Sequence, residues 1–266
     1  MWRDSDFWRV HDEEWPGKSE QFRKGKVASE QRGCEYLHKL GILDWIDDIR
    51  EASKSSGTKY YNLATLWYLI EIHKPKYFLE LGTGVSTHVI ARAMSTHCKH
   101  DDLKLISMEH DELYYDDAIK NKPDCDFLEI IRSDICLENV YSFLLAGYKD
   151  IPYLPYSMVF VDGPPQDTFV SGDLLWVIAN AKDPILGIID QRAMTALVYY
   201  ILLGPKYIKR FGTATFQIGP IEQSVLDYRK LAVDVWKRAE VEDRMYYLVE
   251  GLVKHKDILA EEDNDI

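Results

Sequence analysis

The first third of the chain carries apolar residues at helical spacing. From Gln31 to about Lys54 they recur every three or four positions, and the pattern breaks at Gly41. A further apolar stripe follows, and it predicts a helix that is capped by Asn62 and runs through His73. Pro75 then ends that helix. Residues 31–54 and 62–73 are therefore expected to be helical.

Strand-like apolar runs alternate with helix-compatible stretches after Tyr77. The further runs cover residues 103–109, 127–134, 157–163 and 185–190, and the stretches between them include VSTHVIARAMSTH, DELYYDDAIKN, LENVYSFLLAGY and DLLWVIANA. Two short segments, 207–211 and 214–219, suit a closing antiparallel pair. This order predicts an α/β fold: a doubly wound, mostly parallel seven-stranded sheet with helices on both faces and a helical N-terminal extension.

The chain shows no internal repeat and no linker rich in proline, glycine or serine. We expect an N-terminal extension or lid over residues 1–58, a Rossmann-like core over 59–220, and a helical segment with an acidic tail over 221–266. Residues 1–30 mix tryptophan with charged residues without a clean period. A lid, an oligomer arm in a homo-oligomer and a packed extension remain open for them.

Composition narrows the classes of function. Hydrophobic residues make up 46% of the 266 residues, and the formal net charge is −12 with no compensating basic stripe. Such a surface disfavours nucleic-acid partners. The four cysteines have none of the short spacings of metal or redox sites, and the sequence shows neither a signal peptide nor an apolar run of about 20 residues. These features predict a cytoplasmic protein without a membrane partner.

The segment YFLELGTGVS joins the first strand to the next helix through Gly82 and Gly84. A glycine turn at this point lets the backbone approach a ligand closely. A dinucleotide fingerprint would place its third glycine where Thr87 stands, and its acid about 20 residues on, nearer than Glu109. Both departures disfavour NAD.

These residues resemble the first motifs of class I S-adenosylmethionine-dependent methyltransferases. The family's acid, apolar residue and Gly-x-Gly correspond to Glu80 through Gly84, and Ser86 takes the place of a third small residue. Its later acids correspond to Glu109, to Asp134 after Ser133, and to Asp162 in VFVDGPP. The matches span about residues 60–220, in order, each at the end of an expected strand.

The resemblance implies S-adenosylmethionine as cofactor. Gly82, Thr83, Gly84 and Ser86 would form its turn, with Asp162 nearby. Glu80 would attract the methionine end and Glu109 would accept the ribose hydroxyls, while Asp134 and His110 would lie at the adenine. Carboxylates suit this ligand because it is cationic and carries no phosphate. Asp134 also suits a helix cap, and Glu109 a solvated strand end.

Asp162 and Asp190 are the candidate catalytic residues. In metal-dependent catechol-type O-methyltransferases, an Asp and an Asp-Asn pair at these places bind a divalent cation, which here would give Asp162, Asp190 and Gln191 as ligands of Mg²⁺. Pro165 stands where that family carries a lysine. One acid could instead act as general base, with Arg192 pairing an acidic acceptor. Asp190 could also merely cap the following helix.

The expected activity is methyl transfer to a hydroxyl of a small molecule or glycan. Two alternatives remain: a catalytically degenerate fold kept as a binding or scaffold protein, and an NAD-dependent oxidoreductase.

Overall fold

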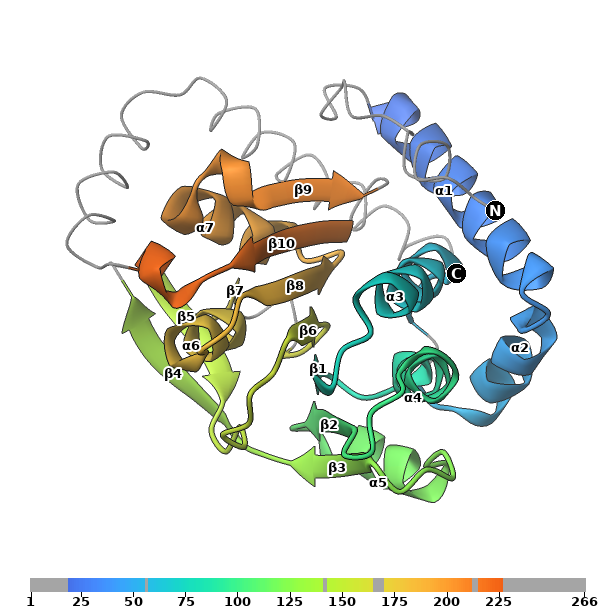
Figure 1. Ribbon diagram of the computed structural model, residues 1–266. Coiled ribbons are helices and arrows are strands. Elements are labelled where there is room, and N and C mark those ends of the chain that lie inside the picture. Colours follow the sequence, from blue (N-terminus) through green and yellow to red (C-terminus); the bar gives the residue numbers. More distant parts are fainter. Residues whose placement is uncertain (1–18, 56, 141–142, 165–169, 212–214, 227–266) are drawn as a thin grey trace.

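A computed structural model describes residues 19–55, 57–140, 143–164, 170–211 and 215–226 (Figure 1). Its centre is a seven-stranded sheet in the order β3-β2-β1-β6-β8-β10-β9. Pairing is parallel from β3 to β8, and β10 is antiparallel to both β8 and β9. The predicted fold class and the closing antiparallel pair are confirmed. The strands are β1 Tyr77–Leu81, β2 Lys104–Glu109, β3 Leu128–Arg132, β6 Met158–Val161, β8 Ile185–Asp190, β9 Ile208–Phe211 and β10 Thr215–Ile221.

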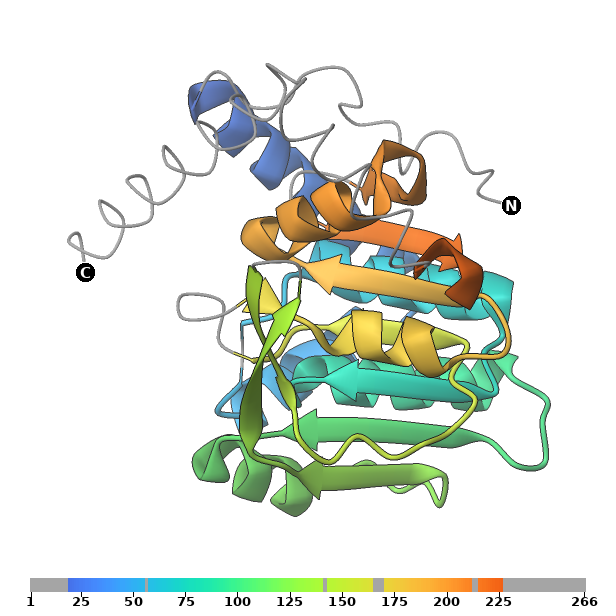
Figure 2. The same ribbon diagram turned by 90° about the vertical axis from the view of Figure 1, so that its left-hand side faces the viewer.

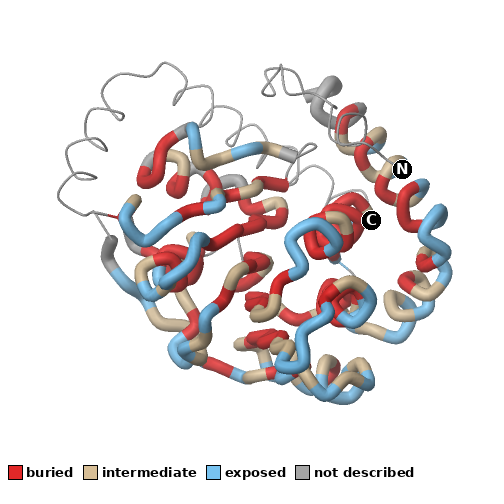
Figure 3. The backbone as a smooth tube through the Cα atoms, viewed as in Figure 1, coloured by how far each residue is buried: buried red, intermediate tan, exposed pale blue. Residues whose placement is uncertain are grey.

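Helices cover both faces of this sheet (Figure 1). Alternating residues of β1 explain why: Phe78 packs in the core on the side of α3 and α4, whereas Leu79 packs in the core on the side of α6 and α7. Both faces are therefore buried, as Figure 3 shows for the central strands. The helices are α1 Ser19–Lys39, α2 Leu43–Ala52, α3 Tyr60–His73, α4 Val85–His97, α5 Glu112–Lys120, α6 Asp173–Asn180 and α7 Ala193–Leu203, with short 3₁₀ turns η1 Pro205–Tyr207 and η2 Gln223–Leu226.

The stretch LENVYSFLLAGY forms a β-hairpin, so the prediction of a helix there was wrong. Strands β4 (Ile135–Val140) and β5 (Phe143–Tyr148) pair antiparallel, and β7 (Val170–Ser171) adds to β5. Residues 140–143 include valine, tyrosine and phenylalanine, which favour strands, and Gly147 disfavours a helix. The hairpin crosses the sheet at the carboxyl ends of the parallel strands (Figure 2).

The start of α3 also differs from the prediction. The N-cap residue is Lys59, which makes no side-chain cap hydrogen bond, and Asn62 lies within the first turn of the helix. The cap comes from α1 instead: Glu30 accepts hydrogen bonds from the backbone N–H of Tyr60 at 3.0 Å and of Tyr61 at 3.1 Å. Asn62 is therefore free to point its side chain into the protein.

Residues 19–39 form α1, which packs against α3. The rest of the first segment, residues 1–18, and the expected C-terminal helix and tail after residue 226 lie outside the described residues. All four cysteines are free thiols. In the described part of the chain, no helix has the length and apolar character needed to cross a membrane.

Candidate active site

The candidate residues gather at the carboxyl ends of β1 and β6. The chain leads from β1 to β2 and β3 on one side of the sheet, and β6 and β8 lie on the other. Strand order thus reverses between β1 and β6, and open α/β sheets bind ligands in the crevice outside such a point. The loops that follow these strands carry Gly82 and Asp162.

The glycine turn after β1 is enclosed on both sides. Gly82 has a φ of +97°, and a Cβ there would lie 2.9 Å from the carbonyl carbon and oxygen of Asp162. Only glycine accommodates both the conformation and this approach. A Cβ on Gly84 would lie 2.5 Å from the hydroxyl oxygen of Ser55, so the loop before α3 covers the other side. The backbone N–H of Gly84 donates to the Thr87 hydroxyl at 3.0 Å.

Glu80 lies fully buried beneath this turn. Three hydroxyl groups donate to its carboxylate: Ser86 at 2.6 Å, Thr87 at 2.7 Å and Ser107 at 2.6 Å. Burial raises the pKa of the Glu80 carboxyl to about 7, although the three hydrogen bonds oppose the shift. These hydrogen bonds tie the first turn of α4 to β1 and β2. The predicted attraction of Glu80 for the methionine end of a ligand, directly or through water, stays a prediction.

Glu109 ends β2 and joins two loops. One carboxylate oxygen accepts from the backbone N–H of Thr83 at 3.2 Å and from its hydroxyl at 3.1 Å. The other oxygen accepts from the backbone N–H of His110 at 2.8 Å and of Asp111 at 3.0 Å. The Nδ1 atom of His110 lies 3.0 Å from that same oxygen. The structure thus brings together Glu109, Thr83 and His110, three of the residues predicted to bind the cofactor.

Asp134 follows β3, the strand next to β2, at the same edge of the sheet as Glu109. Its side chain is exposed, and its backbone carbonyl accepts from the N–H of Lys149 at 2.9 Å. The side chain of Ser133 is used locally, because its hydroxyl accepts from the N–H of Asp150 at 3.0 Å. Asp134 begins no helix, since the chain continues directly into β4. The helix-cap interpretation of Asp134 is therefore wrong.

Asp162 follows β6 and has a side chain that is 32% exposed. Burial raises the pKa of its carboxyl to about 6. The guanidinium of Arg192 opposes this shift, with a nitrogen 3.8 Å from the Asp162 carboxylate. Arg192 also donates to the backbone carbonyls of Asp162 and Pro164. A partly exposed carboxylate with a pKa near neutrality can take up a proton during a reaction.

Asp190 ends β8, whose register with β6 places it beside Asp162. It is 2% exposed, and Asn62 donates a hydrogen bond to its carboxylate. Burial, and next the Asp162 carboxylate, raise the pKa of Asp190 well above its ordinary value. Helix α7 has Arg192 as its N-cap residue without a side-chain cap bond, so Asp190 is not a helix cap.

The surroundings of Asp162 and Asp190 do not favour the predicted magnesium site. The predicted ligands were two carboxylates, Asp162 and Asp190, and the side-chain amide of Gln191. Asp190 is bonded to Asn62, and the positive charge nearest Asp162 is the guanidinium of Arg192. Gln191 has a φ of +46°, a conformation that non-glycine residues seldom adopt, and one that often marks a functional site.

Two residues at this site escaped the sequence interpretation. Tyr148 was assigned to a helix, and Asn62 was taken as a cap. The tyrosine is buried, and its hydroxyl lies against Gly163: a Cβ on that glycine would come within 2.3 Å of the hydroxyl oxygen. The strand-favouring residues around position 140 were the available signal for the hairpin that carries Tyr148.

The sequence matches no family model and no curated protein. Among solved structures, the chain is similar to an O-methyltransferase from Bacillus cereus in complex with S-adenosylhomocysteine, at 13% identity over 69% of this chain and 94% of that one, with a TM-score of 0.46. It is similar to a methyltransferase from Podospora anserina bound to the same molecule, at 12% identity over 92% of this chain and 91% of that one (TM-score 0.43).

A third similar structure is an O-methyltransferase of tomaymycin synthesis from Streptomyces achromogenes in complex with S-adenosylmethionine. Its identity is 15% over 71% of this chain and 88% of that one, with a TM-score of 0.40. Likeness at this level concerns the fold alone, and the ligands of these proteins do not transfer to this chain.

Proposed function

We propose that this protein is an S-adenosylmethionine-dependent methyltransferase that acts on a hydroxyl of a small molecule or glycan. The observation that carries the proposal is the negative charge of the crevice. Glu109 and Asp162 flank the glycine turn, and the guanidinium of Arg192 is bound to the backbone carbonyls of Asp162 and Pro164, 3.8 Å from the Asp162 carboxylate. A cationic ligand gains from such a site, and a pyrophosphate is repelled by it.

The ribose of the ligand would bind at Glu109. All four of the carboxylate's acceptor positions are occupied, by the backbone N–H groups of Thr83, His110 and Asp111 and by the Thr83 hydroxyl. The hydroxyl is the partner that can rotate away, because the three amides are fixed by the backbone. A ribose hydroxyl would take its place, which keeps a hydrogen bond on Glu109 at little cost in free energy.

Asp162 would remove the proton from the acceptor hydroxyl. When bound, S-adenosylmethionine supplies a methyl group on a sulfonium, which is a good leaving group, so alignment of the acceptor provides much of the rate. The Asp162 side chain is 32% exposed at the carboxyl end of β6, whereas Asp190 beside it is 2% exposed. We therefore assign Asp162 as general base and Asp190 as a positioning residue, with Arg192 keeping part of the Asp162 population ionised.

Calorimetry with S-adenosylhomocysteine tests the proposal. We expect saturable binding to the folded chain, and no binding of NADH under the same conditions. Absence of binding at millimolar concentration would overturn the proposal, and tight NADH binding would favour an oxidoreductase. Methylated product from a panel of hydroxyl acceptors separates an enzyme from a scaffold protein. The four free thiols support a reducing, cytoplasmic location, which fractionation of the source cells would check.

A further inference from the structure

We propose that Tyr148 is a ligand-binding residue whose hydroxyl hydrogen-bonds to the nucleoside part of the bound ligand. This inference rests on the proposed function, since it takes the ligand to be S-adenosylmethionine. It adds a contact from the β4–β5 hairpin, an element outside the motifs that suggested the function.

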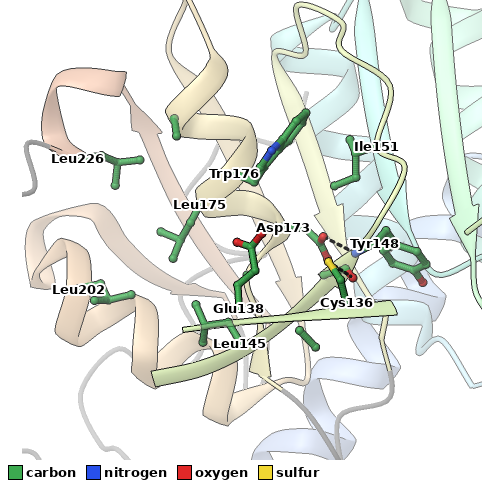
Figure 4. A pocket seen from close by; sticks show the side chains of 14 residues that line it. Cys136, Glu138, Leu145, Tyr148, Ile151, Asp173, Leu175, Trp176, Leu202 and Leu226 are labelled. Atoms are coloured by element: carbon green, nitrogen blue, oxygen red, sulfur yellow. Dashed lines mark hydrogen bonds between the residues drawn. The ribbon is translucent and has the colours of Figure 1, made fainter. Parts of the chain in front are cut away.

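The hairpin holds the tyrosine at the crevice. The backbone N–H of Tyr148 donates to the buried Asp173 carboxylate at 2.7 Å, and the ring points away from the other residues of a neighbouring pocket of about 140 Å³ (Figure 4). The ring of His110 lies edge-on at 6.4 Å between centroids, with an interplanar angle of 69°. Tyr148 therefore spans from Asp173 on one side to the loops after β2 and β6 on the other.

The hydroxyl of Tyr148 is buried without a hydrogen-bond partner in the described part of the chain. Leaving a buried hydroxyl unpaired is costly, so native proteins seldom do it without a reason. Two other buried tyrosines are satisfied: the Tyr156 hydroxyl donates to the carbonyl of Pro152 at 2.9 Å, and the Tyr199 hydroxyl accepts from the N–H of Leu175 at 3.1 Å. The unpaired hydroxyl of Tyr148 points to a partner that binds from solution.

The surroundings indicate which part of the ligand that partner is. The hydroxyl lies against Gly163, and burial and then the Glu109 carboxylate raise the pKa of Tyr148 well above its ordinary value. The phenol thus stays neutral, and it can both donate and accept. Because Glu109 is the expected ribose ligand, a hydroxyl in its field meets the ribose or the base and not the amino-acid end.

Titration calorimetry of wild type and Tyr148→Phe, with S-adenosylhomocysteine and with 5′-methylthioadenosine, tests this assignment. The second ligand keeps the nucleoside and lacks the amino acid. We expect Tyr148→Phe to weaken both ligands by about 2- to 13-fold, the range for one neutral hydrogen bond. Without ligand, its melting temperature should equal or exceed that of wild type, because the lost hydroxyl had no partner.

Tyr156→Phe is the matched control. It removes a hydroxyl that donates to Pro152, so its melting temperature should fall while both ligands bind as to wild type. Equal affinities of wild type and Tyr148→Phe would overturn the Tyr148 assignment and leave the proposed function standing. Weakening confined to S-adenosylhomocysteine would also overturn it, as would a lower melting temperature like that of Tyr156→Phe. If wild type binds neither ligand, the proposed function fails, and the inference fails with it.

Discussion

Asn62 of α3 donates a hydrogen bond to the buried carboxylate of Asp190 at the end of β8. The amide oxygen of Asn62 in turn accepts from the hydroxyl of Thr215 on the neighbouring strand β10. A helix and two strands that are far apart in the sequence are thereby fixed to one another beside Asp162. Both side chains are buried, so the network that fixes Asp190 beside Asp162 is shielded from solvent.

Asn62→Ala should lower the free energy of unfolding by about 1–3 kcal/mol, because it leaves a buried carboxyl without its donor. Urea denaturation at constant pH measures the change. A double-mutant cycle with Asp190→Ala gives the coupling. Additive effects of the two substitutions would show that the hydrogen bond contributes nothing.

Glu109→Ala should weaken binding of S-adenosylhomocysteine by about 1.5–3 kcal/mol, the range for hydrogen bonds to charged groups. Calorimetry on variants with wild-type circular dichroism measures it. The loss should exceed that of Glu112→Ala, which changes an exposed acid on α5 paired only with Arg132 at the surface. If both variants bind equally well, Glu109 does not hold the ligand.

Turnover should rise with pH through about 6 and level off above it, because the Asp162 carboxyl must be ionised to accept a proton and its pKa is about 6. Asp162→Asn should lower kcat by about 10²- to 10⁴-fold and remove this dependence. Affinity for S-adenosylmethionine, measured by calorimetry, should fall as well, because the substitution removes one of the acids that favour the cationic ligand. A pH profile that persists in Asp162→Asn would assign the base elsewhere.

EDTA provides the complementary measurement. A guanidinium nitrogen of Arg192 lies 3.8 Å from the Asp162 carboxylate, and Asn62 donates to Asp190, so we expect chelation to leave kcat unchanged. Loss of activity with EDTA and its return with Mg²⁺ would instead indicate that Asp162 and Asp190 bind a metal ion, as the resemblance to catechol-type O-methyltransferases implies.

Glu80 should make the protein less stable as pH rises. The unfolded carboxyl ionises near its ordinary value of 4.5, whereas the folded one keeps its proton to about 7. Between these values the folded state binds more protons, so the free energy of unfolding falls with rising pH, by roughly 3 kcal/mol in total. Denaturation across this range should show a flatter curve for Glu80→Gln than for wild type.

Ser107→Ala gives a second arm of the same measurement. Its hydroxyl lowers the pKa of Glu80, so removing it should extend the fall in stability to higher pH. Parallel curves for wild type and Glu80→Gln would contradict the burial argument.

The sequence predicted the sheet well because strands buried on both faces are written as continuous apolar runs, as in Ile185–Asp190. The glycine turn and the strand-end acids could also be predicted, because each of them directly follows an apolar run. The hairpin was missed because pairing between β4 and β5 outweighs local helical spacing, and pairing is not a local property.

Side-chain roles were predicted less well than their positions. Glu80 was expected to attract a ligand, directly or through water, and the sequence did not indicate that the hydroxyls of Ser86, Thr87 and Ser107 surround it. Asn62 was expected to cap its own helix, yet Glu30 from another helix does so. In each case, the partner comes from a segment whose proximity only the folded chain defines.

The hydrogen bonds from the first amides of α3 to Glu30 make α1 a stabilising support for the start of α3. Removing α1 would leave those amides without their cap, in a helix that has no cap of its own. The first turn of α3 would then fray, and Asn62 lies in that turn. A truncation far from the crevice would thus weaken the hydrogen bond from Asn62 to Asp190. The loss of an N-terminal helix would in this way misalign the carboxylates at the candidate active site.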